Sequence, residues 1–202
     1  MNKKPKLYSS VAGLIILLLL SGIGTIAQEN MHPFHTEFEP DVITINDLKL
    51  LDSRTGNILH LGMTKKEITA LYGKEDEINM FGNYEYGGLQ VFYRDDVAVK
   101  FDILAGGNLT NRFKTYRGIG LGDAKEDITM KYGEKFADIS PLYGSVLTAY
   151  VIKNKGDTFE TRPSDDPQWS MDWENVYVIA FSSEQKVTMF SMGDSQSVMN
   201  LK

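Results

Sequence analysis

Cysteine is absent from this 202-residue chain, and only three of its residues are histidines. The lack of cysteine excludes disulfides, cysteine–zinc sites, haem-thiolate chemistry, a thiol nucleophile and a lipid-modified cysteine after an export signal. About 175 residues follow the N-terminal leader described below, and a chain of that length can form a core without such cross-links.

Basic side chains are also few. Residues 1–27 contain three lysines and no acid, so the rest of the chain holds 18 basic and 27 acidic side chains, a formal charge of −9. Binding to a phosphate backbone needs clustered lysine and arginine. We therefore expect no nucleic-acid partner.

The N-terminal segment has the parts of an export signal. Lysines come first, an apolar run follows at 11–20, and Thr25 and Ala27 stand where small residues precede a cleavage site. This order predicts a secretory signal peptide over 1–27. The alternative is an uncleaved anchor, because residues 7–28 carry no charge and are long enough to cross a bilayer of roughly 30 Å. Either way the body of the protein is predicted to be extracytoplasmic, secreted or anchored by this segment.

A thirteen-residue phrase occurs twice, at 61–73 and at 121–133, with seven identical positions. Such a self-match at one fixed offset predicts a duplicated unit. Each copy predicts a short helix. Thr64 with Glu67 forms the pattern of a capping box, and so does Asp123 with Glu126. The helices are predicted to face a core with residues at positions i, i+3 and i+4, and to end at glycines: Ile68, Leu71, Tyr72 and Gly73 in the first, and Ile128, Lys131, Tyr132 and Gly133 in the second.

Apolar residues alternate with period two after each helix, which predicts antiparallel strands. The first copy predicts strands at 84–87, 89–94 and 97–103, with a turn at Asp95 and Asp96; the second predicts strands at 146–152, 176–181 and 187–192, with a turn at 182–184. The predicted fold is α+β: two tandem modules, each a short helix packed on an antiparallel meander sheet. The predicted division is a signal peptide or membrane anchor at 1–27, a linker at 28–46, module 1 at 47–105 and module 2 at 106–202.

The second copy contains about 28 additional residues, because the helices are 60 positions apart and the final turns are 88 apart. Most of the excess falls in an excursion at about 154–175, which holds Phe159 and both tryptophans, Trp169 and Trp173. Long connections are often functional, and tryptophan frequently anchors interfaces. The alternative is that the tryptophans fold back over the edge of the core.

The phrase Gly62-Met63-Thr64-Lys65-Lys66-Glu67-Ile68 with Tyr72-Gly73-Lys74-Glu75-Asp76, followed by short aromatic strands, resembles the envelope module of outer-membrane assembly lipoproteins of the SmpA/OmlA type. The duplicated layout resembles the β-lactamase inhibitor protein, which has two such modules in tandem. The stretch from Thr115 to Asp123 is similar to repeats in exported proteins of Gram-positive bacteria. The resemblance covers roughly residues 58–104 and 115–192. No binding residue is carried over from it.

Few residues form a pattern for chemistry. His32 and His35 have a metal-compatible spacing, but His60 is the only other histidine, so we predict no metal site. The excursion contains six carboxylates, which we interpret as a solvated acidic loop: Asp157, Glu160, Asp165, Asp166, Asp172 and Glu174. A hydrolase that uses them is a third alternative. The Gly118-x-Gly120-x-Gly122 pattern fits neither dinucleotide nor P-loop spacing and predicts a turn at the helix start.

The sequence therefore predicts an exported, non-catalytic binding protein without a cofactor. It is expected to recognise another protein through the sheet face and the 154–175 excursion. Phe92 and Tyr93 are adjacent on one strand, so one of them must lie on the face away from the helix. The predicted binding residues are Trp169, Trp173, Phe92, Tyr93 and Phe159. The alternative is a structural or assembly component of the envelope, retained by residues 7–28.

Overall fold

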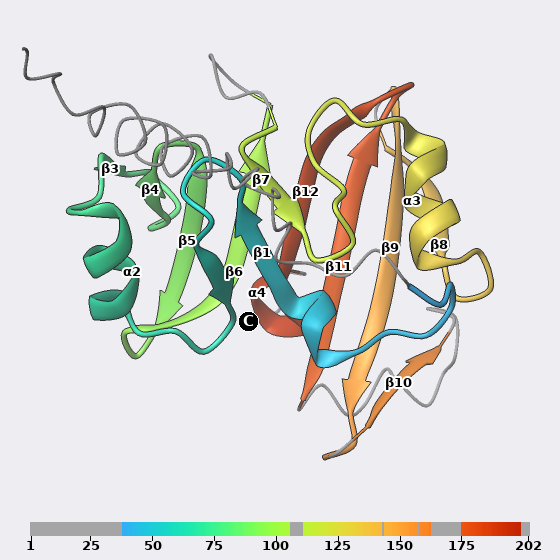
Figure 1. The fold of residues 1–202 in the computed structure, drawn as a ribbon, viewed down its shortest axis with the longest axis horizontal. Coiled ribbons are helices and arrows are strands. Elements are labelled where there is room, and N and C mark those ends of the chain that lie inside the picture. The colour runs from blue at the N-terminus through green and yellow to red at the C-terminus, as the bar shows by residue number, and fades with distance from the viewer. Residues whose placement is uncertain (1–37, 106–110, 143, 157, 163–174, 199–202) are drawn as a thin grey trace, which may run out of the picture. The chain divides into compact units, whose positions relative to one another are not determined.

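The computed structural model describes residues 38–105, 111–142, 144–156, 158–162 and 175–198 (Figure 1). The fold is α+β, as predicted, and its strands are mostly antiparallel neighbours in two sheets. The predicted signal or anchor segment lies outside the described residues. In the part that the structure describes, no helix is long and apolar enough to span a membrane.

The first repeated phrase forms helix α2 (Lys65–Tyr72), and its predicted cap is confirmed. Thr64 Oγ1 accepts from the Glu67 backbone N–H at 3.2 Å, and the Glu67 carboxylate accepts from the Thr64 N–H at 2.7 Å. The helix ends at Gly73, whose φ of 84° is accessible to glycine at little cost. Ile68 is fully buried, whereas Leu71 is 40% exposed, so the predicted three-residue stripe is narrower than expected.

The second phrase forms helix α3 (Lys125–Tyr132), but its predicted cap is wrong. The N-cap residue is Ala124, which has no side chain able to accept a hydrogen bond. Asp123 lies one position earlier, and its carboxylate accepts from the Gly120 N–H at 2.8 Å instead. Asp123 therefore fixes the turn that leads into the helix. Ile128 and Tyr132 are buried as predicted.

The larger sheet has nine strands, in the order β10-β9-β11-β12-β6-β5-β4-β3, with β8 also paired to β9. The strands are β3 (Glu77–Ile78), β4 (Tyr84–Tyr86), β5 (Leu89–Arg94), β6 (Val97–Leu104), β8 (Asp138–Leu142), β9 (Ser145–Asn154), β10 (Phe159–Arg162), β11 (Val176–Ser183) and β12 (Val187–Asp194). Asp95 and Asp96 have φ values of 52° and 61°, as a two-residue hairpin turn between β5 and β6 requires. Strands from the two halves of the chain meet where β12 pairs with β6 (Figure 1).

A second, three-stranded sheet was not predicted. It has the order β2-β1-β7 and consists of β1 (Lys49–Asp52), β2 (Ile58–His60) and β7 (Phe113–Thr115). The 3₁₀ helix η1 (Ile45–Leu48) precedes β1. Residues 38–46, placed in the predicted linker, are held against α3, because the Asp41 N–H donates to the Tyr132 carbonyl and the Arg117 guanidinium donates to the Glu39 carbonyl.

One face of the nine-stranded sheet forms the main core. α2, α3 and the three-stranded sheet all contribute to the same buried cluster as strands from both halves of the large sheet. The largest fully buried side chains include Tyr132, Tyr150, Phe101, Phe181 and Phe190. We call this face the core face and the opposite one the outer face. The short helix α4 (Ser195–Val198) packs on β12, β11 and β6.

The 154–175 excursion is partly regular. Residues Phe159–Arg162 form β10, which pairs with the C-terminal part of β9. A turn joins the two strands, because the Lys155 N–H donates to the Thr158 carbonyl at 2.9 Å. The beginning of the excursion is therefore an additional hairpin and not an irregular loop. Trp169 and Trp173 lie outside the described residues, so both alternatives for them stay open.

Candidate functional site

The outer face carries a continuous row of side chains that crosses eight strands. Strand registers place these residues opposite one another in succession. In order across the sheet they are Glu77, Glu85, Gln90, Asp102, Ser191, Ala180, Ala149 and Asp138. Neighbouring strands are about 4.8 Å apart, so side chains in this row can interact with their neighbours. Carboxylates stand at both ends, and small residues occupy the half made by β12, β11 and β9.

Two hollows lie side by side on this face. The first, about 690 Å³, lies over β5 and β6, is bordered by the loop before β4 and by α4, and mixes aromatic, amide and charged groups. Its lining includes Phe81, Asn83, Gln90, Phe92, Lys100, Asp102 and Leu104. The second, about 350 Å³, lies over β12, β11 and β9 and is mainly apolar. Its lining includes Leu147, Ala149, Val178, Ala180, Met189 and Val198. Lys100 and Asp102 border both hollows, so these form one extended surface.

The boundary between the hollows is a small polar network. Lys100 Nζ lies 2.9 Å from Asp102 Oδ2, and Ser191 Oγ donates to Asp102 Oδ1 at 2.6 Å. The Lys100 and Asp102 side chains are each 15% exposed. Their charges offset one another, and the serine links β12 to β6. The network thus fixes the centre of the face without leaving an unpaired charge there.

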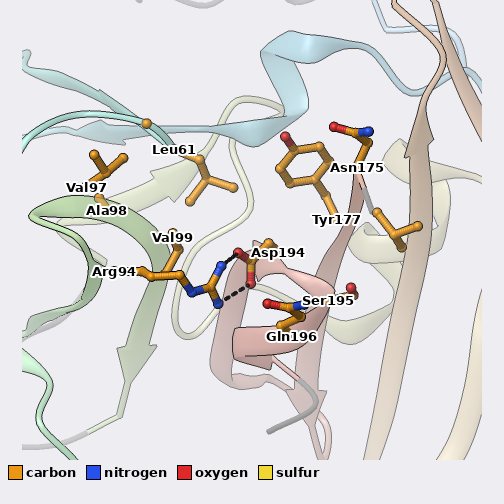
Figure 2. Close-up of a pocket in the computed structure, with 12 residues that line it drawn as sticks. Leu61, Arg94, Val97, Ala98, Val99, Asn175, Tyr177, Asp194, Ser195 and Gln196 are labelled. Carbon is orange, nitrogen blue, oxygen red and sulfur yellow. Dashed lines mark hydrogen bonds and ion pairs between the residues drawn. The ribbon is translucent and has the colours of Figure 1, made fainter. Parts of the chain in front are cut away.

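A third cavity, of about 460 Å³, lies at the end of the sheet (Figure 2). Figure 2 shows Arg94 and Asp194 joined across it, with Leu61 and Val99 on one side and Tyr177 on the other. Arg94 Nη1 lies 2.7 Å from Asp194 Oδ2, and the two side chains are 41% and 23% exposed. Exposed ion pairs contribute about 0–1 kcal/mol, so this pair ties β5 to β12 weakly. It also leaves no unpaired charge in the described lining of this cavity.

The structure separates the predicted binding residues. Phe92 lies on the outer face and lines the first hollow. Tyr93 packs on the core face, where its ring is 5.1 Å from that of Tyr84 and its hydroxyl is 3.3 Å from that of Tyr86. Burial and the Tyr86 hydroxyl raise the pKa of Tyr93, so it stays protonated. Phe159, on β10, is half-buried and packs against the main core.

Several outer-face residues were missed from the sequence, including Phe81, Leu104, Lys100, Asp102 and Ser191. Alternation along 97–104 and 187–193 predicts which side chains point outward. These side chains lie next to one another only because β6 pairs with β12. The exposed pair Met80 and Phe81 was visible in the sequence as two large apolar residues between Asn79 and Gly82. That signal could have been used.

The residues that the sequence offered for chemistry are not brought together in the described part of the chain. Of the six excursion carboxylates, five lie outside the described residues. Glu160, in β10, lies 3.6 Å from Lys155 Nζ. His60 is exposed at the end of the edge strand β2, while His32 and His35 lie outside the described residues. Among the residues that the structure describes, no group of three metal-ligating side chains comes together.

Comparison with known proteins adds little. No protein-family model matches the chain, and no curated protein sequence matches it. One similar solved structure is that of a cysteine-rich secretory protein from Staphylococcus aureus subsp. aureus Mu50, with 11% sequence identity and a TM-score of 0.39. The similarity covers 82% of this chain and 51% of that chain, so this chain spans about half the length of that protein. A likeness at this level carries no inference about function.

Proposed function

We propose that this protein is exported and non-catalytic, and that it binds another protein through the outer face of its nine-stranded sheet. The observation that carries this proposal is the continuity of that face across the β12–β6 junction, with two adjoining hollows. The residues that line the two hollows combine apolar, amide and charged groups, as protein interfaces do. The hollows adjoin each other and together extend over several strands, which suits a protein surface.

The two halves of the sheet are proposed to be tandem modules. Three backbone hydrogen bonds tie the start of each helix to the last hairpin of its own half, and they recur in both halves. In the first half they are Gly62 N to Ala98 O, Ala98 N to Met63 O and Lys65 N to Asp96 O; in the second they are Gly122 N to Val187 O, Val187 N to Asp123 O and Lys125 N to Gln185 O. The matching sets support a duplicated unit.

The same correspondence supports an approximate two-fold relation between the modules. Ala98 corresponds to Val187 in these hydrogen bonds, so Asp102 corresponds to Ser191. These two residues face each other directly where β6 and β12 pair. A two-fold axis through this pair makes the polar network the centre of the proposed binding face. Duplication would thus have produced a wide surface from two small sheets.

The second part of the proposed surface is the excursion at 154–175, with Trp169 and Trp173; Phe159, which packs against the main core, is left out of it. Its described beginning extends the large sheet by one strand, β10. An added edge strand widens the sheet on the module 2 side and is consistent with a larger contact area. The contribution of the two tryptophans remains a prediction.

The alternative role is a structural or assembly component of the envelope, held there by an uncleaved N-terminal segment. The uncharged run at 7–28 favours it. Mass spectrometry of the N-terminus of the protein recovered from its own cells separates the two forms. A chain that begins at Gln28 indicates a secreted protein, and an intact leader indicates an anchored one.

The binding role predicts that substitutions on the outer face, and not elsewhere, weaken the affinity for the partner. Phe92→Ser with Leu104→Ser removes apolar groups from the first hollow, and we expect at least a tenfold weaker affinity for a partner recovered from the extracytoplasmic fraction, which corresponds to about 1.4 kcal/mol. The matched control is Met130→Ser on α3, which removes an apolar group that is 64% exposed on the other side of the core. Affinity is measured by calorimetry, and Tm is compared for all variants. Equal affinity of the double variant and the wild type would contradict the proposal.

A further inference from the structure

One loop presents large apolar side chains to solvent beside the first hollow. Met80 is 89% exposed and Phe81 is 76% exposed, the highest values among the large apolar residues that the structure describes. Phe81 also lines the first hollow, as Phe92 does. An exposed aromatic residue at the rim of a hollow on a proposed binding face is a strong candidate for an anchor.

The loop is fixed by hydrogen bonds. Asn79 Oδ1 accepts from the backbone N–H groups of Phe81 at 3.0 Å and Asn83 at 3.1 Å. The Asn79 N–H donates to the Asn83 carbonyl at 3.0 Å, and the side-chain amides of Asn79 and Asn83 both donate to Gln90 Oε1. Met80 and Phe81 are therefore held outward on a preformed turn. A preformed anchor loses little conformational entropy on binding.

The same end of the outer face is acidic. Glu77 and Glu85 stand directly opposite each other where β3 pairs with β4. Like charges in this position are destabilising, and neither carboxylate forms an ion pair with a described residue. Burial raises the pKa of Glu85, and the neighbouring Glu77 and Asp76 raise it further.

The two cations that line the first hollow are already engaged. Lys100 pairs with Asp102, and Arg94 pairs with Asp194. The acidic pair thus has no counter-charge within the described face, while apolar groups stand beside it. The complement of this surface is a cation next to apolar side chains. An anionic lipid surface would be repelled by the two carboxylates, so a protein segment is the better match.

We propose that the partner binds here with a segment that places a lysine or arginine beside apolar side chains. The apolar groups contact Met80 and Phe81 and enter the first hollow, and the cation lies between Glu77 and Glu85. This inference rests on the proposed function and adds the chemistry of the partner. It assigns the module 1 end of the outer face as the part that determines specificity.

The free protein gives the first test. A raised folded-state pKa means that Glu85 favours the fold when protonated, below the ordinary value of 4.5, and loses that contribution as pH rises through its folded pKa. Glu85→Gln should therefore raise Tm at neutral pH and leave it unchanged at a pH well below 4.5. An unchanged or lower Tm at neutral pH would show that the two carboxylates are not in conflict, and would remove the argument for a cationic partner.

Binding gives the second test, with a phage-displayed library of short random peptides as the probe. Selection on the full-length wild type should enrich peptides that combine lysine or arginine with apolar residues. Peptides selected on Glu77→Gln/Glu85→Gln should no longer be enriched in lysine and arginine. Peptides selected on Met80→Ser/Phe81→Ser should no longer be enriched in apolar residues. The control Glu126→Gln/Glu134→Gln removes two exposed carboxylates from around α3 and should select the same peptides as the wild type. Identical peptides from all four proteins would overturn the inference.

A membrane surface is the competing occupant and has its own readout. Sedimentation with phosphatidylcholine vesicles that is lost in Met80→Ser/Phe81→Ser would overturn the inference in favour of lipid contact. The inference also fails separately from the proposed function. If Phe92→Ser/Leu104→Ser weakens partner binding but Glu77→Gln/Glu85→Gln does not, the outer face binds a partner without the cationic contact.

Discussion

Arg117→Met is expected to lower the free energy of unfolding by about 3–5 kcal/mol, because it leaves a buried carboxylate without its partner. Arg117 and Asp47 are 3% and 1% exposed, and Arg117 Nε lies 2.6 Å from Asp47 Oδ1. The remaining N–H groups of the guanidinium donate to Asp47 Oδ2 and to the carbonyls of Glu39, Val42 and Lys131. All five donors are thus used, and the side chain ties the chain before β1 to α3.

Urea unfolding followed by circular dichroism measures this loss. Adding Asp47→Asn to the Arg117→Met variant should recover part of the stability, since it removes the uncompensated charge. Recovery will be partial, because the carbonyls of Glu39, Val42 and Lys131 still lack the donors that Arg117 supplied. A single variant within about 1 kcal/mol of the wild type would contradict the assignment, since that is the range of exposed ion pairs.

Truncation of either central helix residue should destabilise the whole protein and not only one of the two proposed modules. Ile68 and Ile128 are 0% and 1% exposed and belong to one buried cluster. Each Ile→Ala change is expected to cost about 2–5 kcal/mol. Because β6 and β12 join the two halves in one sheet, both variants should lower the Tm of the same single calorimetric transition.

Leu71→Ala is the matched control on α2, because Leu71 is 40% exposed. It should change stability by about 0.5 kcal/mol or less. Two separate transitions, with each isoleucine variant affecting only one of them, would show that the modules unfold independently. That outcome would contradict the continuous core described above.

Local signals in the sequence predicted local structure well. The capping box of Thr64, the glycine after each helix and the turn at Asp95 and Asp96 all involve residues a few positions apart. The prediction that Asp123 caps α3 was wrong, because an acidic residue near a helix start can accept a hydrogen bond from the preceding turn as well as from the helix. A single sequence does not distinguish these two hydrogen-bonding roles.

Long-range pairings could not be predicted. β1 pairs with β7 through Leu50 and Thr115, two segments of three or four residues without clear alternation. The junction of β6 with β12 likewise pairs residues such as Asp102 and Ser191, which nothing local connects. The outer face exists only because of that junction.

The position of Phe92 shows the same limit within the candidate site. Alternation placed Phe92 and Tyr93 on opposite faces but did not say which was outward. The register with β6 shifts between these two residues. Only the contacts of Tyr93 with Tyr84 and the buried Tyr86, both on β4, identify its side as the core.

Photocrosslinking from single positions tests the central claim, that the outer face contacts a protein partner. A benzophenone amino acid replaces Leu104, 38% exposed on the outer face, or Met130, 64% exposed on α3, and the cells that produce the protein are irradiated. We expect one adduct of discrete mass from position 104 and none from position 130. No adduct from position 104, or equal adducts from both positions, would contradict the account.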